Sequence, residues 1–143
     1  MTMSSELIHL EIVTPERRIL KEVVDEVQVP GKGGYLGILP GHAPLITELQ
    51  IGRISYRKGI HTSYLSVDSG YCEVLPDKVT VLAEKAERGD EIDLNRALSS
   101  KARAEKRLAE IHDPEIDFAR AMASLQRALA RIDTCEKMRG SLL

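Results

Sequence analysis

A glycine-rich segment from Gly31 to Thr47 constrains the fold of this chain more than any other part of the sequence. Five of its seventeen residues are glycine and two are proline, so the backbone can turn where other residues would be strained. Its largest apolar residues before the first proline are Tyr35, Leu36, Ile38 and Leu39. We expect a buried, sharply folded corner here.

The same segment starts with Gly31 and Lys32, a pair that also occurs in phosphate-binding loops. Such a loop needs the Gly-Lys pair to be followed by Ser or Thr, with a strand before it and a helix after it. Here Gly33 follows the lysine, and Pro40 and Pro44 prevent a long helix. A glycine-rich turn is therefore the favoured interpretation.

Short runs of apolar and β-branched residues, separated by turn residues, fill the N-terminal part of the chain. With no Trp and one Phe, the core has to consist of Val, Ile, Leu and Ala. Strands of this length joined by tight turns predict an antiparallel β-sandwich or barrel. The predicted strands cover residues 7–13, two short stretches within 19–29, and residues 45–49, 52–56, 62–67, 71–75 and 78–83.

Near Gly89 the pattern changes, because Ala, Leu, Arg and Glu replace the β-branched residues. A first helix is predicted from Leu94, and a second one begins with Asp113 as the cap and Pro114 at the first helical position. The short connection predicts an antiparallel hairpin with a weak, alanine-lined seam. We expect a β-sandwich of residues 1–88 and an α-helical hairpin of residues 89–143, fraying from Lys137.

Composition and motifs exclude several functions. Residues 1–92 carry fourteen acidic against ten basic residues, which argues against a nucleic-acid-binding protein. No nucleophile, acid–base pair or metal-ligand spacing is recognisable, so we expect neither catalysis nor a metal site. Cys72 and Cys135 are predicted to be free thiols, and His42 to bond nearby backbone. No run of eighteen apolar residues occurs, so membrane association would be indirect.

Arginine recurs at helical spacing on both predicted helices. This spacing places the arginines of each helix on one side. Such a stripe is either a solvated face or a surface that binds phosphates or carboxylates, and spacing alone leaves both open. The residues are Arg96, Arg103 and Arg107 on the first helix, and Arg120, Arg127 and Arg131 on the second.

The run from Tyr35 to Thr47, with Leu-Gly-Ile-Leu-Pro-Gly-His-Ala-Pro-Leu at its centre, resembles the signature of the epsilon subunit of F-type ATP synthases. The resemblance covers nearly the whole chain. It implies a non-catalytic rotor subunit of a proton-translocating enzyme, whose sandwich binds the gamma subunit and the membrane ring of c subunits. The contact residues that it implies are Gly31, Tyr35, Leu36, Gly37, Ile38, Pro40, Gly41, His42, Ala43 and Pro44.

For the hairpin, the resemblance implies a regulatory role. Folded on the sandwich, the hairpin permits turnover; extended along gamma, it reaches the catalytic alpha/beta hexamer and inhibits ATP hydrolysis. The implied location is the cytoplasmic face of the bacterial plasma membrane, or the stromal face of the thylakoid, peripheral to the membrane through the complex.

Residues Ile92 to Ala97 match the family's Ile/Leu-Asp-x-x-Arg-Ala motif, so the resemblance implies that ATP is a regulatory ligand and that no cofactor is obligatory. Its implied ATP-binding residues are Glu87, Ile92, Asp93, Arg96, Ala97, Arg103, Arg120, Arg127 and Arg131. The alternatives are a nucleotide-binding regulatory module of another complex, a free-standing nucleotide-dependent enzyme and a nucleic-acid-binding module.

Overall fold

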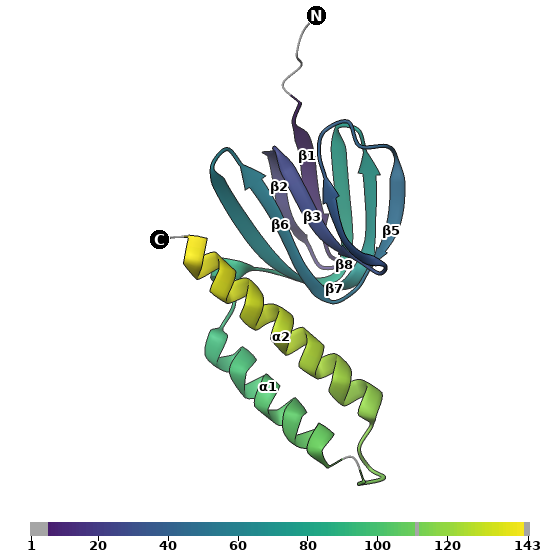
Figure 1. Cartoon of the computed structure of the whole chain (residues 1–143), viewed down its shortest axis with the longest axis vertical. Helices are drawn as coiled ribbons and strands as arrows, with labels where there is room; N and C mark the ends of the chain where they lie inside the picture. The colour runs from purple at the N-terminus through teal and green to yellow at the C-terminus, as the bar shows by residue number, and fades with distance from the viewer. Residues whose placement is uncertain (1–5, 111, 142–143) are drawn as a thin grey trace, which may run out of the picture.

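Eight strands and a helical hairpin make up the computed structural model, which describes residues 6–110 and 112–141 (Figure 1). Apolar side chains alternate along the strands, as in β1, where Ile8, Leu10 and Ile12 are buried. The strands are β1 (Ile8–Val13), β2 (Arg18–Val24), β3 (Glu26–Gly31), β4 (Gly34–Ile38), β5 (Leu45–Leu49), β6 (Gly52–Lys58), β7 (His61–Leu75) and β8 (Lys78–Arg88).

The strands form one folded sheet in the order β2-β1-β8-β7-β5-β3-β4, and β6 pairs with both β3 and β7. The first part of β7 pairs with β6 and its second part with β5, so this strand belongs to both layers of the sandwich. All pairs are antiparallel except β1 with β8, which is parallel. The expected antiparallel sandwich is confirmed, and the one parallel pair joins strands that no hairpin turn connects.

The core between the layers consists of Val, Ile, Leu and Ala residues, as expected from the composition, together with Cys72. Cys72 on β7 is fully buried, and this burial raises the pKa of its thiol to about 12. Cys135 is also buried, and neither cysteine forms a disulfide. The prediction of free thiols is confirmed.

Strand β7 bends sharply at Ser69 and Gly70, whose φ angles are 52° and 133°. At Gly70 the strand lies so close to β8 that a β-carbon would be 2.1 Å from the carbonyl oxygen of Leu82. The sequence predicted two separate strands here, which was wrong, because the backbone bends at a glycine without leaving the sheet.

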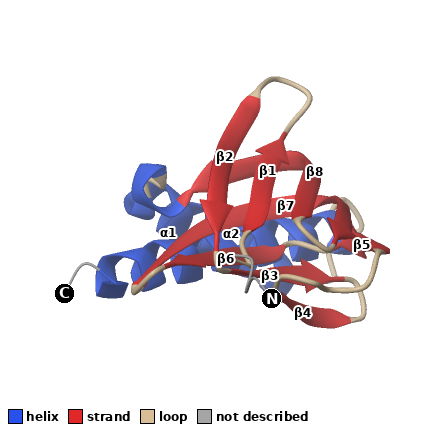
Figure 2. Cartoon of the chain, turned by 90° about the horizontal axis from the view of Figure 1, so that it is seen from above, coloured by secondary structure: helices blue, strands red, loops and turns tan. Residues whose placement is uncertain are grey.

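The C-terminal part contains the 3-10 helix η1 (Gly89–Glu91) and the helices α1 (Leu94–Ala109) and α2 (Phe118–Ser141). Helix α2 lies against β6, β7 and η1, whereas α1 packs mainly on α2, as Figures 1 and 2 show. The buried residues between the helices are small, as the predicted alanine seam requires: Ala97 and Ala104 on α1, and Ala121 and Ala128 on α2. No helix in the described ranges is long and apolar enough to span a membrane.

Both ends of α2 differ from the prediction. The helix starts at Phe118, where Asp117 Oδ1 accepts the backbone N–H of Arg120 at 3.1 Å. Asp113 instead accepts the N–H of Glu115 at 2.9 Å and closes a local turn, so it does not cap the helix. At the other end the helix continues to Ser141 instead of fraying from Lys137, while residues 142 and 143 lie outside the described part.

Candidate functional site

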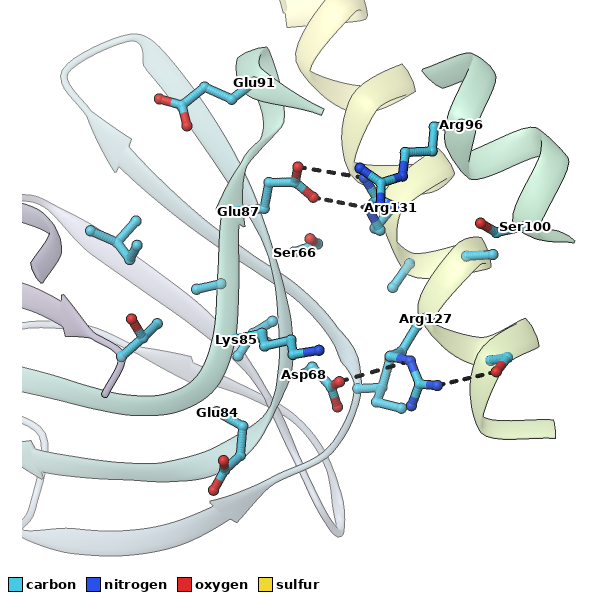
Figure 3. A pocket seen from close by; sticks show the side chains of 18 of the residues that line it. Ser66, Asp68, Glu84, Lys85, Glu87, Glu91, Arg96, Ser100, Arg127 and Arg131 are labelled. Carbon is cyan, nitrogen blue, oxygen red and sulfur yellow. Dashed lines mark hydrogen bonds and ion pairs between the residues drawn. The ribbon is translucent and has the colours of Figure 1, made fainter. Parts of the chain in front are cut away.

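The hairpin and the sandwich line an open cavity of about 700 Å³ (Figure 3). Its sheet wall comes from the β1–β2 turn, β7, β8 and η1, and its helical wall from α1 and α2. Both helices contribute side chains, so the cavity is complete only while the hairpin is folded on the sandwich.

Among the described residues, the helical wall carries five arginines and no acidic residue. Two of these arginines are held by a serine one turn earlier on the same helix: Arg103 Nη2 donates to Ser100 Oγ at 3.0 Å, and Arg127 Nη2 to Ser124 Oγ at 3.1 Å. A serine orients the guanidinium without neutralising its charge, which leaves other N–H groups for a ligand. The five residues are Arg96, Arg103, Arg107, Arg127 and Arg131.

Two of the arginines reach carboxylates across the cavity. Glu87 on β8 accepts hydrogen bonds from Arg131 Nε at 2.9 Å and Nη2 at 3.5 Å, and Asp68 Oδ2 lies 3.9 Å from Arg127 Nε. The other three arginines form no ion pair with the described residues. The helical wall therefore has spare positive charge, a property of surfaces that bind polyanions.

The sheet wall has the opposite character, since it is predominantly acidic. Its carboxylates do not cluster into a group of three or more that could hold a metal ion, within the described ranges of the chain. The wall contains Glu16, Asp68, Glu84, Glu87 and Glu91, together with Arg17 and Lys85.

A separate contact outside the cavity joins the C-terminal half of α2 to the sandwich. Arg53 on β6 forms an ion pair with Asp133, and its guanidinium lies over the ring of Tyr64 at 5.6 Å. The Arg53 side chain is 19% exposed, and its Nε has no hydrogen-bond partner among the described residues. This pair fixes α2 independently of the cavity arginines.

The glycine-rich corner lies at the other end of the sandwich. The loop after β4 is held beside the β7–β8 turn, because the Gly41 N–H donates to the Pro76 carbonyl at 2.7 Å. That turn also accepts the N–H of His9 at the start of β1, far from the helices in Figure 1. His42 Nδ1 donates to the Ala43 carbonyl at 2.7 Å, which confirms the expected bond to nearby backbone.

The expectation of a buried corner was wrong. Tyr35 is 51% and Leu39 57% exposed, and of the apolar residues here only Ile38 is fully buried. The reason is that β4 is an edge strand with one face toward solvent. Lys32 donates to Glu48 at 2.7 Å, which raises the pKa of the lysine, and a strand follows it instead of a helix. This arrangement agrees with the rejection of a phosphate-binding loop.

Comparison with known families covers both structural parts. Residues 7–89 match the beta-sandwich domain of the ATP synthase delta/epsilon chain, and residues 90–136 match its long alpha-helix domain. The chain belongs to the ATP synthase delta/epsilon family. This match favours a subunit of ATP synthase over a free-standing enzyme or a nucleic-acid-binding module.

A curated relative supports this assignment, and two solved structures share the fold. The ATP synthase epsilon chain of Syntrophobacter fumaroxidans is 49% identical over 93% of this chain and 98% of its own length. A chain in the cryo-EM structure of the Euglena gracilis mitochondrial ATP synthase (OSCP/F1/c-ring) is 18% identical, with a TM-score of 0.68 over 96% of this chain and 82% of that one. A chain in the central stalk/c-ring structure of the Tetrahymena thermophila mitochondrial ATP synthase is 10% identical, with a TM-score of 0.58 over 90% of this chain and 96% of that one.

The structure brings together most of the ATP-binding residues that the delta/epsilon family implies. Glu87, Arg96, Arg103, Arg127 and Arg131 line the cavity. The remaining four lie outside its lining: Ile92 and Ala97 are buried, Asp93 Oδ1 caps α1 by accepting the Arg96 N–H at 3.1 Å, and Arg120 is exposed near the start of α2.

Sequence reasoning missed several residues of the cavity. Asp68 and Lys85 face the helical wall from neighbouring strands, and Ser100 and Ser124 position arginines. A signal for the serines was available, since each lies three residues before an arginine on a predicted helix. Asp68 gave no such signal, because it lies two residues before Gly70 in a stretch that reads as a turn.

One expected outcome concerns the corner of this delta/epsilon fold. Gly41 has a φ of 85°, so Gly41→Val should lower the free energy of unfolding by about 1 kcal/mol or more. Gly37 lies in β4 without positive φ and with open space around its Cα, so Gly37→Val should be nearly neutral. Urea unfolding of both variants measures the difference. Equal losses would contradict the conformational argument.

Proposed function

We propose that the chain is a non-catalytic rotor subunit of a proton-translocating F-type ATP synthase. Its sandwich binds the gamma subunit and the ring of c subunits, and the chain is peripheral to the membrane, on the cytoplasmic face in a bacterium. Family membership and the exposed corner support this role. Three further exposed apolar residues, Ile46, Tyr71 and Leu82, lie on the neighbouring strands β5, β7 and β8, and a group of this kind is typical of a protein contact.

The hairpin is a regulatory element that inhibits ATP hydrolysis when it extends toward the catalytic alpha/beta hexamer. A reversible change of this kind requires that the two states differ by only a few kcal/mol. The alanine seam buries little area, and the ion pairs between α2 and the sandwich are partly exposed, which limits each to about 1 kcal/mol. The folded state is therefore held weakly enough to be released.

ATP is the ligand that holds the hairpin folded. The observation that carries this proposal is the helical wall of the cavity, where arginines from both helices converge on one space. A triphosphate with up to four negative charges matches the spare positive charge there. A ligand that binds only the folded hairpin stabilises that state by mass action, so plentiful ATP keeps the inhibitor withdrawn.

The test is calorimetric titration of the isolated chain with ATP. Arg103→Ala and Arg127→Ala, on different helices, should each weaken binding at least several-fold, because a hydrogen bond to a charged group contributes roughly 1.5 to 3 kcal/mol. Arg139→Ala, near the exposed end of α2 and outside the cavity, is the matched control and should bind like the unchanged chain.

Two results would count against the ATP site. One is the absence of ATP-specific heat at millimolar nucleotide, and the other is full affinity in both cavity variants. The rotor role has its own test, which is co-purification of the chain with gamma and a ring of c subunits. The two tests are independent, so either part of the proposal can fail alone.

A further inference from the structure

Asp68 is a cavity residue that the family motif does not include. Its side chain is 22% exposed, and Oδ1 accepts a hydrogen bond from Ser69 Oγ at 3.2 Å. Oδ2 lies 3.9 Å from Arg127 Nε, as the dashed line in Figure 3 shows. The carboxylate therefore lies on a side of the Arg127 guanidinium where an anionic ligand could also bind.

The contact between Asp68 and Arg127 can be exchanged easily. Its separation is at the long end of the range for an ion pair, and the Arg127 side chain is 40% exposed. The bond from Arg127 to Ser124 keeps the guanidinium in position whether or not Asp68 is paired. By comparison, Glu87 holds Arg131 with two hydrogen bonds and is the more firmly fixed of the two carboxylates.

We infer that Asp68 competes with the phosphate groups of ATP for Arg127 and thereby lowers the affinity of the cavity. This inference rests on the proposed function and adds a residue that sets the affinity of the same site. When a phosphate takes Arg127, Lys85 remains near Asp68, because it is the partner of Asp68 in the β7–β8 register and lines the same cavity. The exchange therefore leaves Asp68 beside a positive charge.

Whether neutralising Asp68 strengthens or weakens ATP binding depends on the states in which the Asp68–Arg127 contact forms. The Asp68–Arg127 contact is present only in the folded, ligand-free state; it is lost when the hairpin leaves the sandwich and when a phosphate holds Arg127. Neutralising Asp68 destabilises only that competing state, and it also removes a negative charge near the phosphates. Both effects favour binding. If Asp68 instead supported Arg127 in the ligand complex, its loss would weaken binding.

The experiment is calorimetric titration of the full chain and its Asp68→Asn variant with ATP. Asp68→Asn should bind ATP roughly two- to fivefold more tightly, the range expected for a partly exposed charge contact. Glu73→Gln, on the same strand but outside the cavity, should bind like the unchanged chain. Glu84→Gln removes a charge from the same wall without an ion pair to the described residues, and its effect should be smaller.

Each outcome is decisive. Equal or weaker binding by Asp68→Asn, while the unchanged chain binds ATP, overturns the role of Asp68 and leaves the ATP site intact. An equal gain in ATP affinity by Glu84→Gln also overturns the role of Asp68, because the effect would then come from the general charge of the cavity. If neither the unchanged chain nor any variant binds ATP, the proposed ATP site fails and the inference fails with it.

A second measurement needs no nucleotide. In the ligand-free chain, amide hydrogen exchange in α2 should be faster for Asp68→Asn than for Glu73→Gln, because one contact between α2 and the sandwich is lost. Identical exchange in the two variants would show that Asp68 does not hold Arg127 in the ligand-free state.

Discussion

Replacing Gly70 by alanine should lower the melting temperature of the chain by about 10 °C or more. Gly70 has a φ of 133°, and a β-carbon there would lie 2.1 Å from the Leu82 oxygen and 2.8 Å from the Ala83 Cα. Both are backbone atoms of the paired strand β8, so they cannot move aside as a side chain would. Strain and overpacking together cost at least about 3 kcal/mol.

Gly33→Ala is the matched control for this change. Gly33 has no atom within 4 Å of the added carbon and no positive φ, so its replacement should leave the melting temperature almost unchanged. Differential scanning calorimetry of both variants makes the comparison. Similar small shifts would mean that β7 can straighten at Ser69 and Gly70, and that the bend is not required by the close approach to β8.

Deleting residues 93–143 should raise ATP hydrolysis by the assembled ATP synthase several-fold if the hairpin is the inhibitor. The sandwich should still fold and assemble, because its buried core cluster is formed entirely by the strands. The measurement is the rate of ATP hydrolysis by complexes reconstituted with the full or the shortened chain, together with the amount of chain incorporated.

Asp133→Asn should change ATP hydrolysis in the opposite direction to the deletion. It breaks the ion pair with Arg53, loosens α2 from the sandwich and should favour the extended, inhibiting state. Hydrolysis should therefore fall with Asp133→Asn and rise with the deletion. Unchanged hydrolysis in both would remove the regulatory role, and a rise in both would mean that the folded hairpin is the inhibiting state.

Alternation of apolar residues and alanine-rich helical spacing predicted the two-part architecture well. Both patterns report which residues face a core, and Ala97, Ala104, Ala121 and Ala128 indeed form the buried seam. Patterns of this kind do not report what covers a strand on its outer face. The corner was therefore predicted to be buried from its apolar content, although its edge position leaves Tyr35 exposed.

The cavity was predictable only in part. Helical spacing placed Arg96, Arg103 and Arg107 on one side of their helix, and all three line the cavity. The opposing wall depends on how the sandwich folds and on where the hairpin lies against it. Asp68 meets Arg127 only through that long-range arrangement, and no local pattern in the sequence encodes such a contact.

The layering of the C-terminal part determines how the hairpin can leave the sandwich. Helix α1 rests mainly on α2, and the chain enters α1 from η1 through Ile92 and Asp93 alone. Once α2 detaches, little else binds α1 to the strands, so both helices can leave the sandwich. The pivot of that movement is the two-residue joint, whose Ile92 side chain is almost completely buried against the rest of the chain. Detachment thus needs no helix to unwind, only rotation about this joint.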